Sequence, residues 1–443
     1  MATSDVRSWI SQSVSFKIFV VGILALFLLI PAAMIRDLIK ERQLNSEQVV
    51  NEISGKWGNA QTVAGPVISV PFIRRTAVNG KIVESREYAH FLPEQLDISG
   101  KMDPEIRYRG IYKVILYTTD MLIKGTFKNP DFGEWKIAPA DILWDEAYVS
   151  LGIPDMRGIK NDLKIQFNGV DYEVTPGLDS QDVLKQGISA RVKLDASNTY
   201  TYSINLKLKG SSALSFVPLG KVSKVAMEST WATPKFDGAF LPENREVGPA
   251  GFKADWTVLH LNRNFPQKWI GSNYDVYESA FGVNLLFPVD HYQKSERAAK
   301  YALMFIALTF MVFLFSEILN RRKIHPVQYI LVGLALCVFY TLLVSLSEQL
   351  GFTVAYILAS SGTIGLIGSY AFAIFKNRRQ SLVLIGVLGV LYIFLFTILQ
   401  LEDYALIMGS IGLFAALAVV MRISRKVDWY SPLNGGPAEM PKE

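Results

Sequence analysis

Cysteine is almost absent from this chain: among 443 residues there is one, Cys337, and it lies inside a long apolar run. Outside that run, a disulfide and a zinc site of the thiolate type are excluded. Histidine is scarce too, because the four histidines are scattered and no two stand at a spacing typical of metal ligands. The sequence therefore predicts no metal site, no bound cofactor and no catalytic residues of these types.

A strong charge of one sign is lacking as well. The chain has 45 Lys and Arg residues against 40 Asp and Glu residues, which gives a net charge of +5. Between residues 41 and 297 the two signs nearly balance, so the excess comes from short loops between apolar runs and from the C-terminal tail. No basic face suits nucleic acid and no acidic tract is present, so nucleic acid is not an expected partner.

Long apolar runs, in contrast, are abundant. A helix needs about 20 apolar residues to cross roughly 30 Å of hydrocarbon. Six runs approach or meet this length, and we expect each to form a transmembrane α-helix: Ile18–Ile35, Tyr301–Leu319, Val327–Leu346, Phe352–Phe375, Leu382–Leu399 and Tyr404–Met421. The chain is therefore predicted to be a multi-pass membrane protein, with the lipid bilayer as its first partner.

The loops between these runs alternate in charge. The loops at 321–323, 376–379 and 422–426 are basic, whereas those at 347–349 and 400–403 contain no Lys or Arg. Short basic loops remain on the cytoplasmic side of a membrane. The alternation therefore predicts that the N- and C-termini are both cytoplasmic and that the segment before Tyr301 lies outside the cytoplasm.

The charges next to the first apolar run do not by themselves support this orientation. Arg36, Lys40 and Arg42 follow it on the predicted outer side, but the three later loops agree with one another, and large domains cross membranes largely regardless of charge. A cleaved signal peptide is the alternative, although Pro31–Met34 makes a poor cleavage site, so we expect an uncleaved anchor. The predicted layout is a cytoplasmic N-terminus at 1–15, a first helix at 16–35, a periplasmic domain at 36–297, a bundle of five further helices at 298–422 and a cytoplasmic tail at 423–443.

The long insertion has the composition of strands. Residues Tyr202–Leu208 alternate between polar and apolar side chains, which places the apolar ones on one face of a strand. Helical patterns are confined to Arg36–Trp57, a continuation of the first helix, and to Ala138–Trp144. We expect a large β-rich domain resembling an antiparallel sandwich, with strands at Val63–Phe72, Lys81–Phe91, Ile111–Phe127, Leu163–Val174, Ser189–Leu194, Tyr200–Lys209, Val222–Thr230, Phe252–His260 and Phe281–Val289.

This domain has few candidate catalytic residues. His90 alternates within a predicted strand and is expected in the core. Gly210–Ser212 ends a strand but lacks the strand–turn–helix frame of a nucleophile elbow. Asp141, Asp145 and Glu146 form an acidic cluster; a metal or sugar site is conceivable there, but a solvated turn is the favoured interpretation. The sequence therefore predicts a protein that is not an enzyme.

One loop has the composition of an interaction surface. Phe265 and Trp269 stand among polar residues in a loop, with Tyr274 and Tyr277 beyond it. Such a composition suits contact with a partner or with the membrane interface. The alternative, a loop that packs on its own domain, stays equally open.

The membrane part carries no charge near the middle of a span, since Lys300, Glu317 and Glu348 all stand at span ends. A proton-coupled transporter would be expected to have an interior carboxylate. The last three runs are instead rich in small residues, which let neighbouring helices approach closely. We expect helix packing at these positions, with a conduit or lipid groove as the alternative: Ser361, Gly365, Gly368, Ser369, Gly386, Gly389, Gly409 and Gly412.

Several segments together resemble a known family. Ser295–Ala302 and His325–Gly333 are similar to the blocks that open the C-terminal bundle of CreD, an inner-membrane protein family. Gly65–Pro71, Gly251–Trp256 and Val427–Tyr430 are similar to further CreD segments, in the same order along nearly the whole chain. The resemblance implies a multi-pass protein of the inner membrane of Gram-negative bacteria, with a role in cell envelope integrity and a link to a two-component system and to the antibiotic response.

The resemblance supplies no catalytic residues, and two hypotheses follow. The first, which we favour, is a non-enzymatic protein whose periplasmic domain binds an envelope lipid, peptidoglycan or a protein partner. The second is a transporter-like or lipid-handling protein that uses its five-helix bundle. A membrane enzyme ranks third, because the bundle has neither paired carboxylates nor a histidine cluster. The sequence does not predict the oligomeric state.

Overall fold

The structure, a computed structural model, describes residues 14–78, 81–194, 198–287, 291–319, 324–401 and 404–425. The chain divides into two compact units. The membrane unit comprises Met1–Ser46 and Val289–Glu443, and the β domain comprises Glu47–Pro288. The predicted basic loop at Arg321–Lys323 and the segment Val427–Tyr430 lie outside the described residues.

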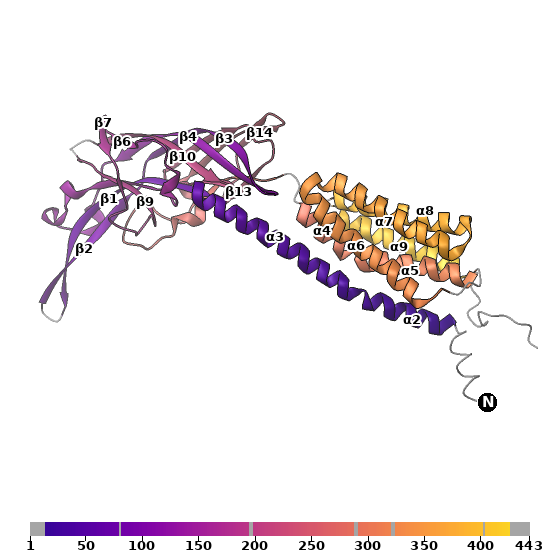
Figure 1. Cartoon of the computed structure of the whole chain (residues 1–443). Helices are drawn as coiled ribbons and strands as arrows, with labels where there is room; N and C mark the ends of the chain where they lie inside the picture. Colours follow the sequence, from indigo (N-terminus) through magenta and orange to yellow (C-terminus); the bar gives the residue numbers. More distant parts are fainter. Residues whose placement is uncertain are drawn as a thin grey trace, which may run out of the picture. The chain divides into compact units, whose positions relative to one another are not determined.

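The membrane unit is built from long apolar helices, and α4 to α9 lie side by side in Figure 1. Within the described ranges, five helical stretches are long and apolar enough to cross a membrane, and the pair α4 and α5, bent by 45°, makes a sixth if it is one span. The helices are α2 (Val14–Phe27), α3 (Leu29–Trp57), α4 (His291–Lys300), α5 (Ala302–Leu319), α6 (Pro326–Leu350), α7 (Phe352–Phe375), α8 (Arg378–Gln400) and α9 (Ala405–Ser424). Every expected apolar run is therefore helical, but the count of spans is five or six.

The β domain contains two sheets. The first has nine strands in the order β13-β17-β11-β1-β5-β9-β8, with β2 beside β1 and β16 beside β2. Its strands are β1 (Gln61–Val78), β2 (Lys81–Phe91), β5 (Tyr148–Gly152), β8 (Thr175–Pro176), β9 (Gly187–Arg191), β11 (Ala213–Val217), β13 (Pro234–Gly238), β16 (Lys268–Ile270) and β17 (Phe281–Leu285).

The second sheet has eight strands in the order β14-β15-β12-β3-β4-β10-β6-β7. Alternation along β10 and β12 puts one face of each in the core and the other in solvent. The strands are β3 (Gln95–Arg109), β4 (Tyr112–Lys128), β6 (Lys164–Phe167), β7 (Val170–Glu173), β10 (Thr199–Ser211), β12 (Val222–Ser229), β14 (Asn244–Gly248) and β15 (Gly251–Leu259).

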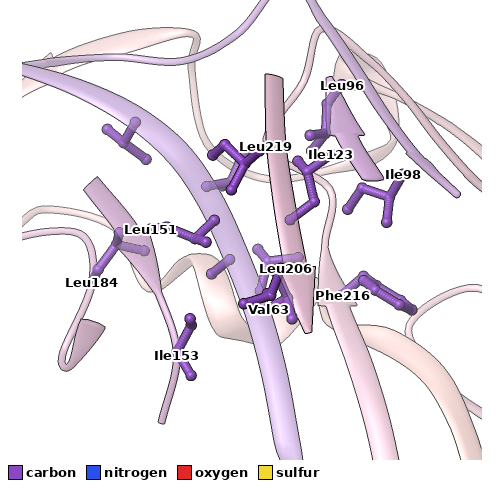
Figure 2. Packing of buried hydrophobic residues seen from close by; sticks show 14 of the residues in the cluster. Val63, Leu96, Ile98, Ile123, Leu151, Ile153, Leu184, Leu206, Phe216 and Leu219 are labelled. Atoms are coloured by element: carbon purple, nitrogen blue, oxygen red, sulfur yellow. The ribbon is translucent and has the colours of Figure 1, made fainter. Parts of the chain in front are cut away.

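A single hydrophobic core joins the two sheets. Val63 and Phe216 from the first sheet belong to the same buried cluster as Ile123 and Leu206 from the second, and Figure 2 shows these four side chains close to one another. Burial of apolar surface on this scale is the main stabilising contribution to the domain. The domain is thus held together by packing, as expected for a chain without disulfides.

The expected antiparallel sandwich needs correction in two respects. Both sheets are mixed, because β1 pairs in parallel with β11 and β12 pairs in parallel with β3. The expected helix at Ala138–Trp144 is wrong: the chain there forms two short 3₁₀ turns, Pro139–Asp141 and Trp144–Glu146. A proline and neighbouring polar residues favour such turns over a continuing helix.

The helix expected at Arg36–Trp57 is confirmed as part of α3. Its last residue, Trp57, contacts the β domain: the indole donates to the carbonyl of Tyr117 at 3.3 Å. The Arg107 guanidinium and the Lys209 ammonium lie 4.1 and 4.3 Å from the indole ring, within the range of cation–π attraction. These contacts fix the end of α3 on the domain that follows it.

Candidate functional site: a polar cavity and two charged clusters

The β domain has a cavity of about 570 Å³ at one edge of the first sheet. Three pieces of chain form it: Asn59, which lies two residues before β1, the segment after β5 and the connection from β8 to β9. The pairing of β5 with β9 brings the last two together. Its lining residues are Asn59, Pro154, Asp155, Met156, Arg157, Gly177, Leu178, Gln181, Lys185, Gln186 and Gly187.

Asp155 organises one wall of this cavity. Its buried carboxylate accepts hydrogen bonds from the backbone and side-chain nitrogens of Asn59, both at 3.0 Å. It also accepts from Nε and Nη2 of Arg157, both at 2.8 Å. The bond with the Arg157 guanidinium holds the pKa of Asp155 below its ordinary value, so the carboxylate stays ionised. Asn59 and Arg157 are therefore positioned by the same buried acid.

The opposite wall, residues 177–187, is fixed by Asp182. Its carboxylate lies 3.2 Å from Nε2 of His90, and the hydrogen bond lowers the pKa of Asp182. The other ring nitrogen of His90, Nδ1, lies 2.9 Å from Oγ of Ser69. His90, expected in the core, is indeed buried, with 1% of its surface exposed. The chain Ser69–His90–Asp182 pins this segment to the sheet.

A Ser–His–Asp chain also invites a catalytic interpretation. Nucleophilic catalysis needs a serine oxygen that a substrate can reach, with donors nearby for an oxyanion. Ser69 is buried, with 2% of its surface exposed, so its hydroxyl is not open to a substrate. The chain is therefore best understood as a structural support for the cavity wall.

The lining of the cavity combines polar and apolar groups in similar proportion and is weakly basic. Amide groups come from Asn59, Gln181 and Gln186, and cationic groups from Arg157 and Lys185. Amides pair with hydroxyl and amide groups, and cations pair with carboxylates or phosphates. The cavity is thus suited to a polar ligand rich in hydroxyl, amide or carboxylate groups. No group of three or more metal-ligating side chains occurs anywhere in the described ranges.

In the membrane unit, the first charged cluster joins α2 to α5 and α6. Lys17 forms an ion pair with the buried Glu317. The same carboxylate accepts from the hydroxyl of Tyr329 at 3.0 Å and from the backbone nitrogen of Ile324 at 3.1 Å. Because a buried carboxylate needs such partners to offset its desolvation, the cluster ties the first helix to the bundle.

The second charged cluster ties α3 to the opposite end of α6. Nε and Nη2 of Arg42 both donate to Glu348, the former at 2.9 Å. The hydroxyl of Tyr292 in α4 donates to the same carboxylate at 2.9 Å. Both acids stand at helix ends, as the sequence predicts, but sequence alone does not reveal their partners. The long first helical stretch is therefore bound to the bundle at two separate points.

Comparison with known proteins decides the family. The family model described as inner membrane protein CreD matches residues 13–430. Inner membrane protein CreD of Escherichia coli (strain K12) is 36% identical over 416 residues, covering 92% of this chain and 91% of that protein. The chain belongs to the CreD family. The family is one of inner membrane proteins, in agreement with the apolar helices.

The expected aromatic surface of this CreD-family chain is largely absent. Phe265 and Trp269 are buried, at 7% and 4% exposure, and both belong to the core. Arg263 donates to the carbonyl of Phe265 at 2.6 Å and to the carbonyl of Leu219 at 3.2 Å, so it links this loop to the rest of the domain; burial of Arg263 lowers its pKa to about 10. Of the four aromatics, Tyr274 is exposed and Tyr277 is half-buried.

Tyr277 nevertheless lies next to the cavity. The Lys185 ammonium is 5.8 Å from the centre of its ring. A partly exposed aromatic ring beside a polar cavity offers a flat apolar face, which suits the faces of sugar rings as well as peptide side chains. The sequence analysis selects Tyr277 because it belongs to an aromatic loop. It misses the residues that line the cavity, because they form no sequence motif.

Two of the three acids of the acidic cluster in this CreD-family chain, Asp141 and Glu146, are ion-pair partners. Asp141 pairs with Arg75 of β1, and Glu146 pairs with Arg86 of β2 at 2.6 Å. These pairs support the solvated-turn interpretation over a metal or sugar site. At Gly210–Ser212 the strand β10 leads into β11 rather than into a helix, so the frame of a nucleophile elbow is missing.

The small residues of the CreD bundle fall into two groups. An added Cβ would meet Ile385 at Gly368 and the ring of Phe394 at Gly412, so these glycines permit close packing with α8. At Gly409 the nearest atom is the hydroxyl of Tyr301, at 3.7 Å. At Gly365, Gly386 and Gly389 it would meet nothing within 4 Å. Ser361, Gly365 and Ser369 share an exposed face of α7, so in the described part of the bundle the expected packing is not seen along this face.

Proposed function

We propose that this protein maintains cell envelope integrity as a non-enzymatic binding protein of the inner membrane. In this proposal the β domain lies in the periplasm and both termini lie in the cytoplasm, as the charge of the short loops favours. The observation that carries the proposal is the polar cavity of about 570 Å³, which is within the size range of ligand sites. The proposed link to a two-component antibiotic response rests on the family resemblance alone.

The chemistry of the cavity favours one kind of envelope component. Its amides and its two cations match hydroxyl, amide and carboxylate groups, which peptidoglycan fragments carry in high density. Acyl chains of a lipid would instead leave these polar groups unpaired, at a cost of about 1–3 kcal/mol each. We therefore propose a peptidoglycan sugar or peptide, rather than a lipid tail, as the ligand.

Sedimentation with peptidoglycan tests this proposal. Purified full-length protein in lipid nanodiscs is mixed with isolated sacculi, and the bound fraction is measured after centrifugation. We expect binding by the wild type and by Lys164→Ala, an exposed lysine on β6 outside the cavity, and strongly reduced binding by the Gln181→Ala/Lys185→Ala double variant. Equal binding by all three proteins, or no binding by the wild type, would contradict it.

A second candidate function is favoured by α7. Its exposed face of Ser361, Gly365 and Ser369 leaves room along a helix that otherwise belongs to an apolar bundle. A face of small residues can accept a lipid chain or a neighbouring helix. In this alternative the bundle handles a lipid or an apolar solute, and the β domain receives it.

A further inference from the structure

The helix α4 forms a basic corner of the membrane unit. It is bent by 45° from α5, and it packs against α6 and α8. Four of its ten residues are His291, Lys294, Arg297 and Lys300. The corner lies where α6 ends, α7 begins and α8 ends, because residues of all three contact α4.

Lys294 is a buried cation at this corner. Only 8% of its surface is exposed. Its ammonium donates to the side-chain oxygen of Gln400 at 2.8 Å and lies 5.5 Å from the ring centre of Phe352. Throughout the described ranges no carboxylate lies within ion-pair distance of it. A neutral amide and a ring face offset only part of the cost of removing an ammonium from water.

Arg297 adds a second such charge one turn further along the helix. Its Nη1 is buried and has no hydrogen-bond partner among the described residues. The acids that the structure describes near this corner are already engaged: Glu348 binds Arg42 and Tyr292, and Glu296 pairs with Lys300 at 3.0 Å. Two cations of α4 are therefore left without an acid in the part of the chain that the structure describes.

We propose that Lys294 and Arg297 bind the phosphate of an anionic phospholipid at this corner. A phosphate offers several acceptor oxygens, and a guanidinium beside an ammonium is a common arrangement for binding it. Basic pockets between the ends of transmembrane helices bind lipid headgroups in this way. A lipid is favoured over free phosphate because the helices next to the corner expose apolar side chains along which acyl chains can lie, such as Val354 and Ile357 of α7.

Lipid titration of the full-length protein tests the proposal. The thermal unfolding midpoint and the number of bound lipids, by native mass spectrometry, are measured in detergent with phosphatidylglycerol, with phosphatidylcholine or with inorganic phosphate. We expect phosphatidylglycerol to bind most tightly and to raise the midpoint. Arg297→Gln and Lys294→Gln should each weaken its affinity about fivefold, the effect of one charge near a membrane surface.

Lys300→Gln is the matched control, because Lys300 is exposed on the same helix and already paired with Glu296. It should keep wild-type affinity. If Lys294→Gln fails to fold, Lys294→Arg, which keeps the charge, should restore both folding and binding, while Arg297→Gln still reports the loss. Equal stabilisation by phosphatidylcholine or by inorganic phosphate, or an equal loss in Lys300→Gln, would overturn the proposal.

Discussion

Asp155 is the single residue on which the cavity wall most depends. Five donor groups of Asn59 and Arg157 converge on its two carboxylate oxygens. We predict that Asp155→Ala lowers the free energy of unfolding of the β domain by about 1–3 kcal/mol, the usual contribution of hydrogen bonds to a charged group. Urea unfolding followed by tryptophan fluorescence measures this change. An unchanged midpoint would show that the network does not hold the wall.

The same residue predicts a dependence on pH. The pKa values of Asp155 and Asp182 are lowered in the folded state, by Arg157 and by His90 respectively. Their contribution to stability is therefore complete above the ordinary aspartate pKa of about 3.9, and it is lost as the pH falls through the lower folded values. In Asp155→Asn the loss of stability below about pH 4 should be shallower than in the wild type. Unfolding curves recorded between neutral and acidic pH test this, and equal slopes would contradict it.

Substitutions at two glycines of α7 distinguish a position packed against another helix from a position on an open helix face. Gly368→Leu should destabilise the bundle by about 1–3 kcal/mol, because its Cβ would lie 2.9 Å from Ile385. Gly365→Leu should change stability by less than about 0.5 kcal/mol, because nothing lies within 4 Å of the added Cβ. Thermal unfolding in detergent compares the two variants. If Gly365→Leu folds normally but fails to complement a deletion strain, the exposed face is functional and the lipid-handling alternative gains support.

Single residues also mark the limit of sequence reasoning at the candidate site. The composition of the loop at 265–277 predicts exposed aromatics, but Phe265 and Trp269 are buried, in a loop that Arg263 links to the domain through the carbonyl of Leu219. The cavity residues are even less accessible to prediction, since Asn59, Arg157 and Lys185 are near neighbours only because β1 pairs with β5 and β5 pairs with β9. The spacing of residues along the chain does not predict which strands pair.

At the scale of elements, the two charged clusters decide how firmly the first helical stretch is held. We predict that Glu317→Ala destabilises the full-length protein by about 3–5 kcal/mol, because it leaves Lys17 without its acid and Tyr329 without an acceptor. Glu296→Ala, which breaks the exposed pair with Lys300, is the control and should cost less than about 0.5 kcal/mol. Thermal unfolding in detergent provides both values, and a similar cost for the two variants would argue against a clamp at Glu317.

Elements with a clear periodicity could be predicted and those without it could not. Eight of the nine expected strands correspond to single strands in the structure, and the apolar runs are helices; the ninth, Leu163–Val174, is instead the hairpin of β6 and β7, which turns at Asn168 and Gly169. β5 is missed because all five of its residues are buried, so no alternation is visible. β3 is missed because it contains Gly100 and Pro104. Gly100 is needed because a Cβ there would lie 2.7 Å from the side chain of Met121. Pro104 is tolerated because the pairing of β3 with β12 ends at Met102, before the proline.

At the scale of the whole molecule, the sequence predicted which secondary structure each unit contains better than it predicted how the strands are connected. A helical membrane unit and a β-rich domain follow from hydrophobic periodicity alone. The two parallel pairings join strands far apart in the sequence, such as β1 with β11, and no local pattern encodes them. The two units carry different candidate sites: the domain has the cavity, and the membrane unit has an open helix face and a basic corner.

Survival of a deletion strain under detergent and a β-lactam tests most directly whether the cavity carries the function. The strain expresses the full chain, residues 1–297, the Gln181→Ala/Lys185→Ala variant or the Lys164→Ala control, each at matched abundance. We predict rescue by the full chain, by residues 1–297 and by Lys164→Ala, and failure of the cavity variant. Rescue by the cavity variant together with failure of residues 1–297 would contradict the proposal and would place the function in the helical bundle.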